Sequence, residues 1–243
     1  LGSRLGRVLA PPAESAHALC YAPPMELAEP AHSKLHVHFR VGRIPGRVHW
    51  SFWLFATLLG LVNANASLVT VSLWIAAVFT SIVAHELGHA LAAHAYGMAP
   101  RIVLYGMGGV AVYRPVRKSW TSRVLIAAAG PGAGFLLAGL IVVGGVAMGY
   151  AVRLDPFNFR VGSGTLIDGR LGLFVRDMLF VNVFWGLLNL LPIQPLDGGN
   201  ITAAILARTN PQRALERSFQ ISMYVSLGVM AVMLIIFNSI FMT

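Results

Sequence analysis

Long stretches without charged residues constrain this chain more than any other feature of its sequence. Residues 48–85, 124–152 and 218–243 carry no Asp, Glu, Lys or Arg, and shorter charge-free runs cover 87–100 and 178–196. A helix of about 20 apolar residues crosses the hydrocarbon core of a bilayer. Only 11% of the residues are charged, whereas about 25% is typical of soluble domains. The chain is therefore predicted to be a polytopic membrane protein.

The predicted fold class is all-α, with a bundle of about five to six transmembrane helices. The first run is too long for one upright helix and contains the polar turn sequence NANAS. We therefore expect spans at about 48–62, 67–96, 119–150, 172–192 and 218–241. The sequence RIVLYGMGGVAVYRP, residues 101–115, is too short to span and rich in β-branched residues and glycine. It predicts a short re-entrant extended or β segment, which must be buried in protein or line a wet cavity.

Three regions are expected along the chain: a cytoplasmic N-terminal extension (1–47), a membrane core (48–207), and a basic loop with a C-terminal span (208–243). The net charge of +9 does not indicate nucleic acid, because Lys and Arg cluster between the predicted spans. Residues 1–47, 101–123 and 208–217 hold 6, 5 and 3 of them, against 4 in 153–176. The positive-inside rule then places the first three segments in the cytoplasm. A bacterial inner membrane is the expected location.

The sequence HELGH at residues 85–89 places three ionisable side chains inside an apolar stretch. Such residues are costly in a membrane and indicate a functional site. His85 and His89 lie one helical turn apart, so both imidazoles can bind one Zn²⁺ ion. Glu86 is then the expected general base toward a metal-bound water. The single cysteine, Cys20, excludes both a disulfide within the chain and a zinc site built from several cysteines.

A third zinc ligand must come from elsewhere in the chain. His94 lies nine residues after His85, about 180° around the helix, and is therefore excluded. Asp197, in PLDGGN, is the strongest candidate, although an Asp before two glycines is also typical of a turn or of an N-cap for residues 198–207. Asp177 is the second candidate, but about twenty residues of helix should separate it from the depth of Asp197. HELGH and LDGG both fall near cytoplasmic ends of predicted spans.

These motifs together resemble the site-2 protease family of intramembrane zinc metalloproteases. The resemblance covers about residues 45–207 and rests on HELGH, Gly108-Gly109, the Ala-Gly-Pro at 129–131 and LPIQPLDGG. It implies that Asp197 is the third zinc ligand and that Asn189 lines the active site, where it would stabilise the oxyanion. It also implies that Gly108 and Gly109 offer a strand edge to an unfolded substrate segment, by β-augmentation.

The chain also departs from that family's pattern. Family members usually carry an asparagine shortly after Ala-Gly-Pro, where this chain has Gly134, so a polar role there is lost or moved. No PDZ-like insertion fits between the predicted spans, and no nucleotide-binding CBS domain follows the fourth span. The sequence is that of a compact form close to the catalytic core.

The expected function is hydrolysis of a peptide bond within or near a transmembrane segment, as in regulated intramembrane proteolysis, by a zinc metalloendopeptidase with one Zn²⁺ ion per chain. The expected partners are a transmembrane protein substrate and the lipid bilayer; a regulatory membrane partner is left open. Two alternatives remain from the residues alone. One is a membrane zincin of another type that acts on soluble or lipidated peptides. The other is an ion transporter that uses Glu86 and Asp197, although no inverted repeat is evident.

Overall fold

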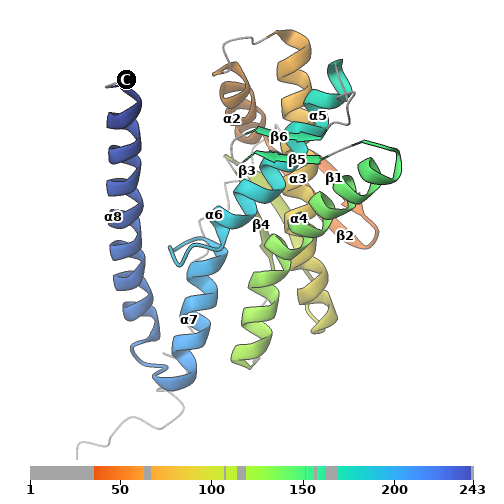
Figure 1. Cartoon of the computed structure of the whole chain (residues 1–243). Coiled ribbons are helices and arrows are strands. Elements are labelled where there is room, and N and C mark those ends of the chain that lie inside the picture. The colour runs from red at the N-terminus through yellow and green to blue at the C-terminus, as the bar shows by residue number, and fades with distance from the viewer. Residues whose placement is uncertain are drawn as a thin grey trace, which may run out of the picture.

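A computed structural model of the chain describes residues 36–62, 67–106, 108–113, 119–150, 152–155, 158–161 and 169–241. Helices dominate these residues (Figure 1). Four helical stretches are long and apolar enough to cross a membrane: α3 (Leu68–Ala95), α4 (Trp120–Ala147), Gly169–Asn189, and Ala214–Ile235 within α8 (Ala214–Phe241). This arrangement confirms the predicted class, a polytopic helical membrane protein.

The third of these stretches is one helical rod with an irregular middle. It consists of α5 (Gly169–Phe180), a π-helical segment η1 (Val181–Trp185) and α6 (Gly186–Asn189). A loop through residues 190–196 follows, and α7 (Asp197–Thr209) then leads to α8. Pro131 lies buried inside α4, and the helix continues on both sides of it.

The first predicted span differs from expectation. Its helix, α2 (Trp50–Leu61), has 12 residues. At 1.5 Å per residue it is about 18 Å long, too short for a hydrocarbon core of about 30 Å. A strand occupies the residues up to His49, and the Nδ1 of His49 accepts a hydrogen bond from the backbone N–H of Ser51 as an N-cap. Among the described residues, four helices rather than five thus reach spanning length.

The extended segment predicted at 101–115 forms two strands, β3 (Arg101–Tyr105) and β4 (Gly108–Val112), in a larger sheet than the sequence indicated. Residues assigned to the N-terminal extension supply its other half, β1 (His36–Val41) and β2 (Ile44–His49). The strand order is β1-β2-β3-β4, with β2 and β3 parallel and the other pairs antiparallel. A separate hairpin, β5 (Val152–Asp155) and β6 (Asn158–Val161), lies in the connection between α4 and α5.

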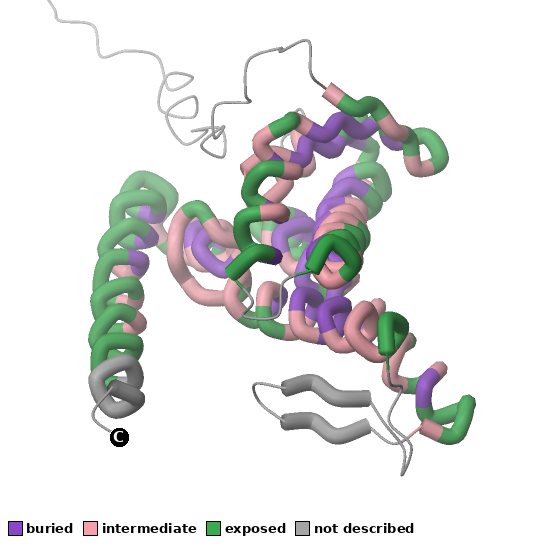
Figure 2. The backbone as a smooth tube through the Cα atoms, turned by 90° about the horizontal axis from the view of Figure 1, so that it is seen from above, coloured by how far each residue is buried: buried purple, intermediate pink, exposed green. Residues whose placement is uncertain are grey.

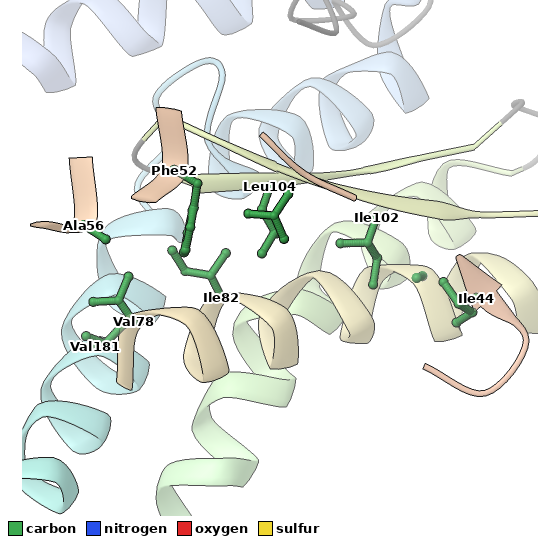
Figure 3. Packing of buried hydrophobic residues seen from close by; sticks show 10 residues of the cluster. Ile44, Phe52, Ala56, Val78, Ile82, Ile102, Leu104 and Val181 are labelled. Carbon is green, nitrogen blue, oxygen red and sulfur yellow. The ribbon is translucent and has the colours of Figure 1, made fainter. Parts of the chain in front are cut away.

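A hydrophobic core joins this sheet to the helices. Phe52 of α2 and Leu104 of β3 point toward Ile82 of α3 (Figure 3), and all three side chains are buried. Val181 of η1 contacts the same cluster beside Val78 of α3. The sheet is thereby fixed on α3, the helix that carries HELGH.

The α3 and α4 helices cross at very close range. A Cβ atom added at Gly88 of α3 would overlap the carbonyl oxygen of Ala129 and lie 2.7 Å from the Cβ of Ala133 in α4. Small residues on the two helices permit this approach. By contrast, α8 stands apart from the other spans, and its residues are mostly exposed as far as Ile235 (Figures 1 and 2).

Candidate metal centre

Three ionisable side chains of α3 are buried where the helix passes the sheet and α4. His85, Glu86 and His89 are 9%, 5% and 8% exposed. Two faces of the helix are involved: the histidines face α4 and α7, and Glu86 faces β4. His94, which its angle around the helix excluded as a ligand, is exposed and lies outside the group formed by His85, His89 and Asp197.

Asp197 reaches the histidines from the first turn of α7. A tight turn brings it there: a Cβ at Gly198 would overlap the carbonyl oxygens of Leu190 and Leu191, so only glycine fits. Oδ2 of Asp197 lies 3.0 Å from Nε2 of His85, and Oδ1 lies 3.2 Å from Nε2 of His89. Asp197 does not cap α7, because the N-cap is Leu196. Its carboxylate therefore contacts the two histidines and makes no capping hydrogen bond to α7.

The donor atoms fit a zinc ion. The two Nε2 atoms are 3.2 Å apart. One ligand atom from each of His85, His89 and Asp197 lies within 4.8 Å of the others. Donors at the corners of a tetrahedron around Zn²⁺ are separated by about 3.3 Å, given metal–ligand distances near 2.0–2.1 Å. Two imidazoles and a carboxylate leave a fourth position open, which is the composition of catalytic rather than structural zinc sites.

The charge state of Asp197 suits this role. Burial raises the pKa of its carboxyl, but hydrogen bonds from His85 and His89 and their charges outweigh this and lower the pKa to about 2. The carboxylate is therefore anionic at neutral pH, the form in which it binds a metal.

The imidazole of His89 is oriented by α4. Its Nδ1 donates a hydrogen bond to the carbonyl oxygen of Ile126 at 2.7 Å, which fixes the ring orientation and turns Nε2 toward Asp197, where it would bind a metal once deprotonated. The ring fits only because residue 130 is glycine: a Cβ there would overlap Nε2 and Cε1 of His89. The small residues predicted to serve helix packing thus also make room for a metal ligand.

Glu86 lies against the edge of the sheet. The backbone N–H of Ala111 in β4 donates a hydrogen bond to its carboxylate. A Cβ at Gly109 would lie 2.7 Å from the Cγ of Glu86, so glycine is needed for β4 to pass this close. Both contacts hold the carboxylate beside the histidines without taking it into the cluster of donors.

The remaining sequence candidates lie outside the cluster. Asp177 is buried, but its carboxylate pairs with the Arg176 guanidinium at 2.8 Å rather than with a histidine. Asn189 ends α6 and is partly buried. Gly108 starts β4 and has open space where a side chain would be.

Sequence reasoning missed three groups next to the site. Two are backbone atoms, the Ile126 carbonyl and the Ala111 N–H, which no residue type reveals. The third is Asn182, whose amide side chain is 3% exposed and lies in the middle of an apolar span. Its position could have identified it from the sequence, because polar residues are rare inside membrane spans and those that occur there usually have a function.

Comparisons with known proteins agree with this arrangement. A family model described as Peptidase family M50 matches residues 73–235. A zinc metalloprotease of Methanocaldococcus jannaschii is 31% identical over 172 residues, 70% of this chain and 45% of its own length. A Mycobacterium tuberculosis protein whose name describes it as a zinc metalloprotease is 32% identical over 188 residues, 69% of this chain and 43% of its own length. This chain spans less than half the length of either relative.

A solved structure is similar as well. The site-2 protease from Methanocaldococcus jannaschii matches with a TM-score of 0.54 and 26% sequence identity. The match covers 86% of this chain and 87% of that one.

Proposed function

The chain belongs to peptidase family M50, the site-2 protease family, and from this premise we propose that it is a zinc metalloprotease that hydrolyses a peptide bond within or next to a transmembrane segment. The observation that carries the proposal is the meeting of His85 and His89 with Asp197, more than a hundred residues away, beside a buried Glu86. His85, His89 and Asp197 would hold the zinc ion. Zinc supplies Lewis-acid chemistry there: it polarises a carbonyl and lowers the pKa of water toward about 7.

Glu86 is the proposed general base and acid. Its carboxylate accepts the proton of the attacking water and delivers it to the nitrogen of the leaving amine. The hydrogen bond from Ala111 keeps one side of this carboxylate occupied and fixes its orientation toward the histidine pair. Proton transfer by a positioned group of this kind contributes about 10²–10⁴-fold to a rate.

The β4 strand is the proposed substrate platform. It is the last strand of the sheet, and among the described residues no strand pairs with its outer edge. An unwound substrate segment can add to such an edge through backbone hydrogen bonds. Gly108, with open space beside it, and Gly109, in contact with Glu86, would let the substrate backbone approach the catalytic carboxylate. Asn189 is the proposed donor to the oxyanion.

The proposed substrate is itself a membrane protein, because the site is built between apolar helices. HELGH lies within α3, one of the four helices that can span a bilayer. The distribution of Lys and Arg supports an active site near the cytoplasmic face, in the inner membrane if the source is a bacterium. A transmembrane substrate would reach such a site from the bilayer after local unwinding.

Purified full chain, reconstituted with single-span membrane proteins, tests this proposal. Glu86→Gln should retain zinc and lose cleavage by about 10²-fold or more. Asp197→Ala should lose zinc and cleavage together, because two imidazoles alone hold the ion weakly. Asp177→Asn is the matched control, since it changes a buried carboxyl that lies outside the cluster and should leave zinc content unchanged.

Three results would contradict the proposal. Full cleavage activity in Glu86→Gln would show that Glu86 is not the general base. Unchanged tight zinc binding in Asp197→Ala would favour a zincin with another third ligand. Cleavage of soluble or lipidated peptides in preference to membrane spans would assign a different substrate class.

A further inference from the structure

The two histidines of the metal centre differ in how their second ring nitrogen is satisfied. Nδ1 of His89 donates to the Ile126 carbonyl. His85 directs Nε2 at Asp197 and His89, and within the described part of the chain no hydrogen bond forms at its Nδ1. A histidine that binds a metal almost always donates its other ring N–H to a carbonyl, a carboxylate or water. A partner for His85 is therefore expected nearby.

A small cavity lies beside His85, between α3, α4 and η1. Its lining includes Ser81, Gly134 and Asn182, and it offers about 10 Å³ to the centre of a water-sized sphere. This volume is close to the minimum of roughly 10–15 Å³ that one water molecule needs.

The side chain of Asn182 brings an unsatisfied acceptor to this cavity. Its Nδ2 donates to Oγ of Ser81 at 2.8 Å and to the carbonyl oxygen of Met178 at 2.7 Å. The Met178 carbonyl only accepts, so the amide cannot be flipped without setting two acceptors against each other. Oδ1 is therefore the free end: it is buried and has no hydrogen-bond partner.

Two features of the backbone are arranged around this amide. A Cβ at Gly134 would lie 3.3 Å from Oδ1, so the glycine leaves the acceptor uncovered on the α4 side. Asn182 is the second residue of η1, and π-helical turns of this kind occur frequently at functional sites. The polar group that is missing from α4 at residue 134 is thus present on the facing helix.

We propose that one buried water molecule occupies this cavity, accepts a hydrogen bond from Nδ1–H of His85 and donates one to Oδ1 of Asn182. Asn182 is then a positioning residue: it fixes the tautomer and ring orientation of His85 through the water, as Ile126 does directly for His89. The inference rests on the proposed zinc site, since it concerns one of that site's ligands.

Zinc affinity of the full chain in detergent, measured by competition with a chromogenic chelator, tests the proposal. Asn182→Leu fills the space with apolar atoms and removes the acceptor, so affinity should fall by about 10–100-fold. Asn182→Ala leaves room for a second water in place of the amide, so its loss should be smaller. Ser81→Ala keeps Oδ1 and should stay within about threefold of the unaltered protein.

This order separates positioning from packing. If Asn182 only fills space, Asn182→Ala must lower zinc affinity more than Asn182→Leu, because it leaves the larger void. That order would overturn the proposal, as would a Ser81→Ala loss equal to that of Asn182→Leu. The visible spectrum of the Co²⁺-substituted protein gives a second readout: it should shift more in Asn182→Leu than in Ser81→Ala.

The same experiment distinguishes this inference from the proposed function. An unaltered protein that binds no zinc contradicts both. An unaltered protein that binds zinc tightly, together with an Asn182→Leu variant of equal affinity and spectrum, contradicts only the role of Asn182. A structure of the zinc-loaded protein with no water within hydrogen-bonding distance of Oδ1 would also overturn it.

Discussion

The two histidines of the metal centre are held where α3 crosses α4, and Asp197 is held by the pair α7 and α8, here called the α7–α8 arm. The two regions do this by different means. At the crossing, Gly88 and Gly130 bring the helices so close that one added methyl group meets a backbone carbonyl or a ligand ring. In the arm, α8 contacts α7 and the loop before it through Ser218 and Ser222, while its outer face is exposed. The histidine half is therefore set by steric fit, and the Asp197 half by a glycine turn and a few hydrogen bonds.

The serine contacts of α8 are specific. Ser222 Oγ accepts from the backbone N–H of Gln194 at 2.8 Å and lies 3.3 Å from the Pro192 carbonyl. Ser218 Oγ accepts from the Gln194 side chain and donates to the Gly199 carbonyl at 3.3 Å. Together the two hydroxyls bind the loop before Asp197 and the first turn of α7 after it. Substitutions should therefore lower zinc affinity and stability most at the α3–α4 crossing and least on the outer face of α8.

The largest effect is expected for Gly130→Ala. Its methyl group would overlap the His89 ring, so the imidazole must rotate away and zinc affinity should fall by more than about 100-fold. Gly132→Ala, on the same helix with nothing within 4 Å, is the control and should bind zinc normally. Equal affinities in the two variants would show that the ring is not confined by α4.

The second largest effect is expected for Gly88→Ala, which should lower the stability of the protein. The added methyl group meets the Ala129 carbonyl, and overpacking of this kind costs about 1–3 kcal/mol. Thermal unfolding in detergent should show a lower midpoint than for Gly139→Ala, where a Cβ meets nothing within 4 Å. A midpoint at or above that of the Gly139 variant would argue against close helix contact.

Ser222→Ala should have a moderate effect. It leaves the Gln194 N–H without its acceptor, a loss of about 1 kcal/mol, and loosens the loop that positions Asp197. Zinc affinity should fall a few-fold, whereas Ser226→Ala, at an exposed position one turn further along α8, should leave it unchanged. The arm would be irrelevant to the site if both serine variants behaved alike.

The smallest effect is expected for Met230→Leu. Met230 is 55% exposed, and a volume-conserving apolar exchange at such a position changes the free energy of unfolding by no more than about 0.5 kcal/mol. Unfolding midpoints and zinc affinity should match the unaltered protein. A large loss would mean that this face of α8 is covered by protein.

Much of the site followed from local spacing. The i, i+4 separation of His85 and His89 fixes their common face on any helix, and the same geometry sends His94 away from it. The sequence predicted Asp197 at the same membrane depth as the histidines and Asp177 at a different depth. In the structure Asp197 lies 3.0 Å from His85, whereas Asp177 pairs with Arg176. The sheet was harder to predict, because β1 and β2 gain their partner, β3, only after an intervening helix pair.

Sequence alone predicted the membrane class, the histidine pair and Glu86, because apolar length and helical spacing are local properties of a chain. Asp197, more than a hundred residues away, was a candidate from its motif and its predicted depth. Tertiary structure decided what surrounds them: the Ala111 N–H on Glu86, the Ile126 carbonyl on His89, and Asn182 facing the cavity beside His85. These contacts join residues 25 or more positions apart. They exist only because glycines at 88, 109, 130 and 134 let backbones approach, and no spacing rule records which backbone will be there.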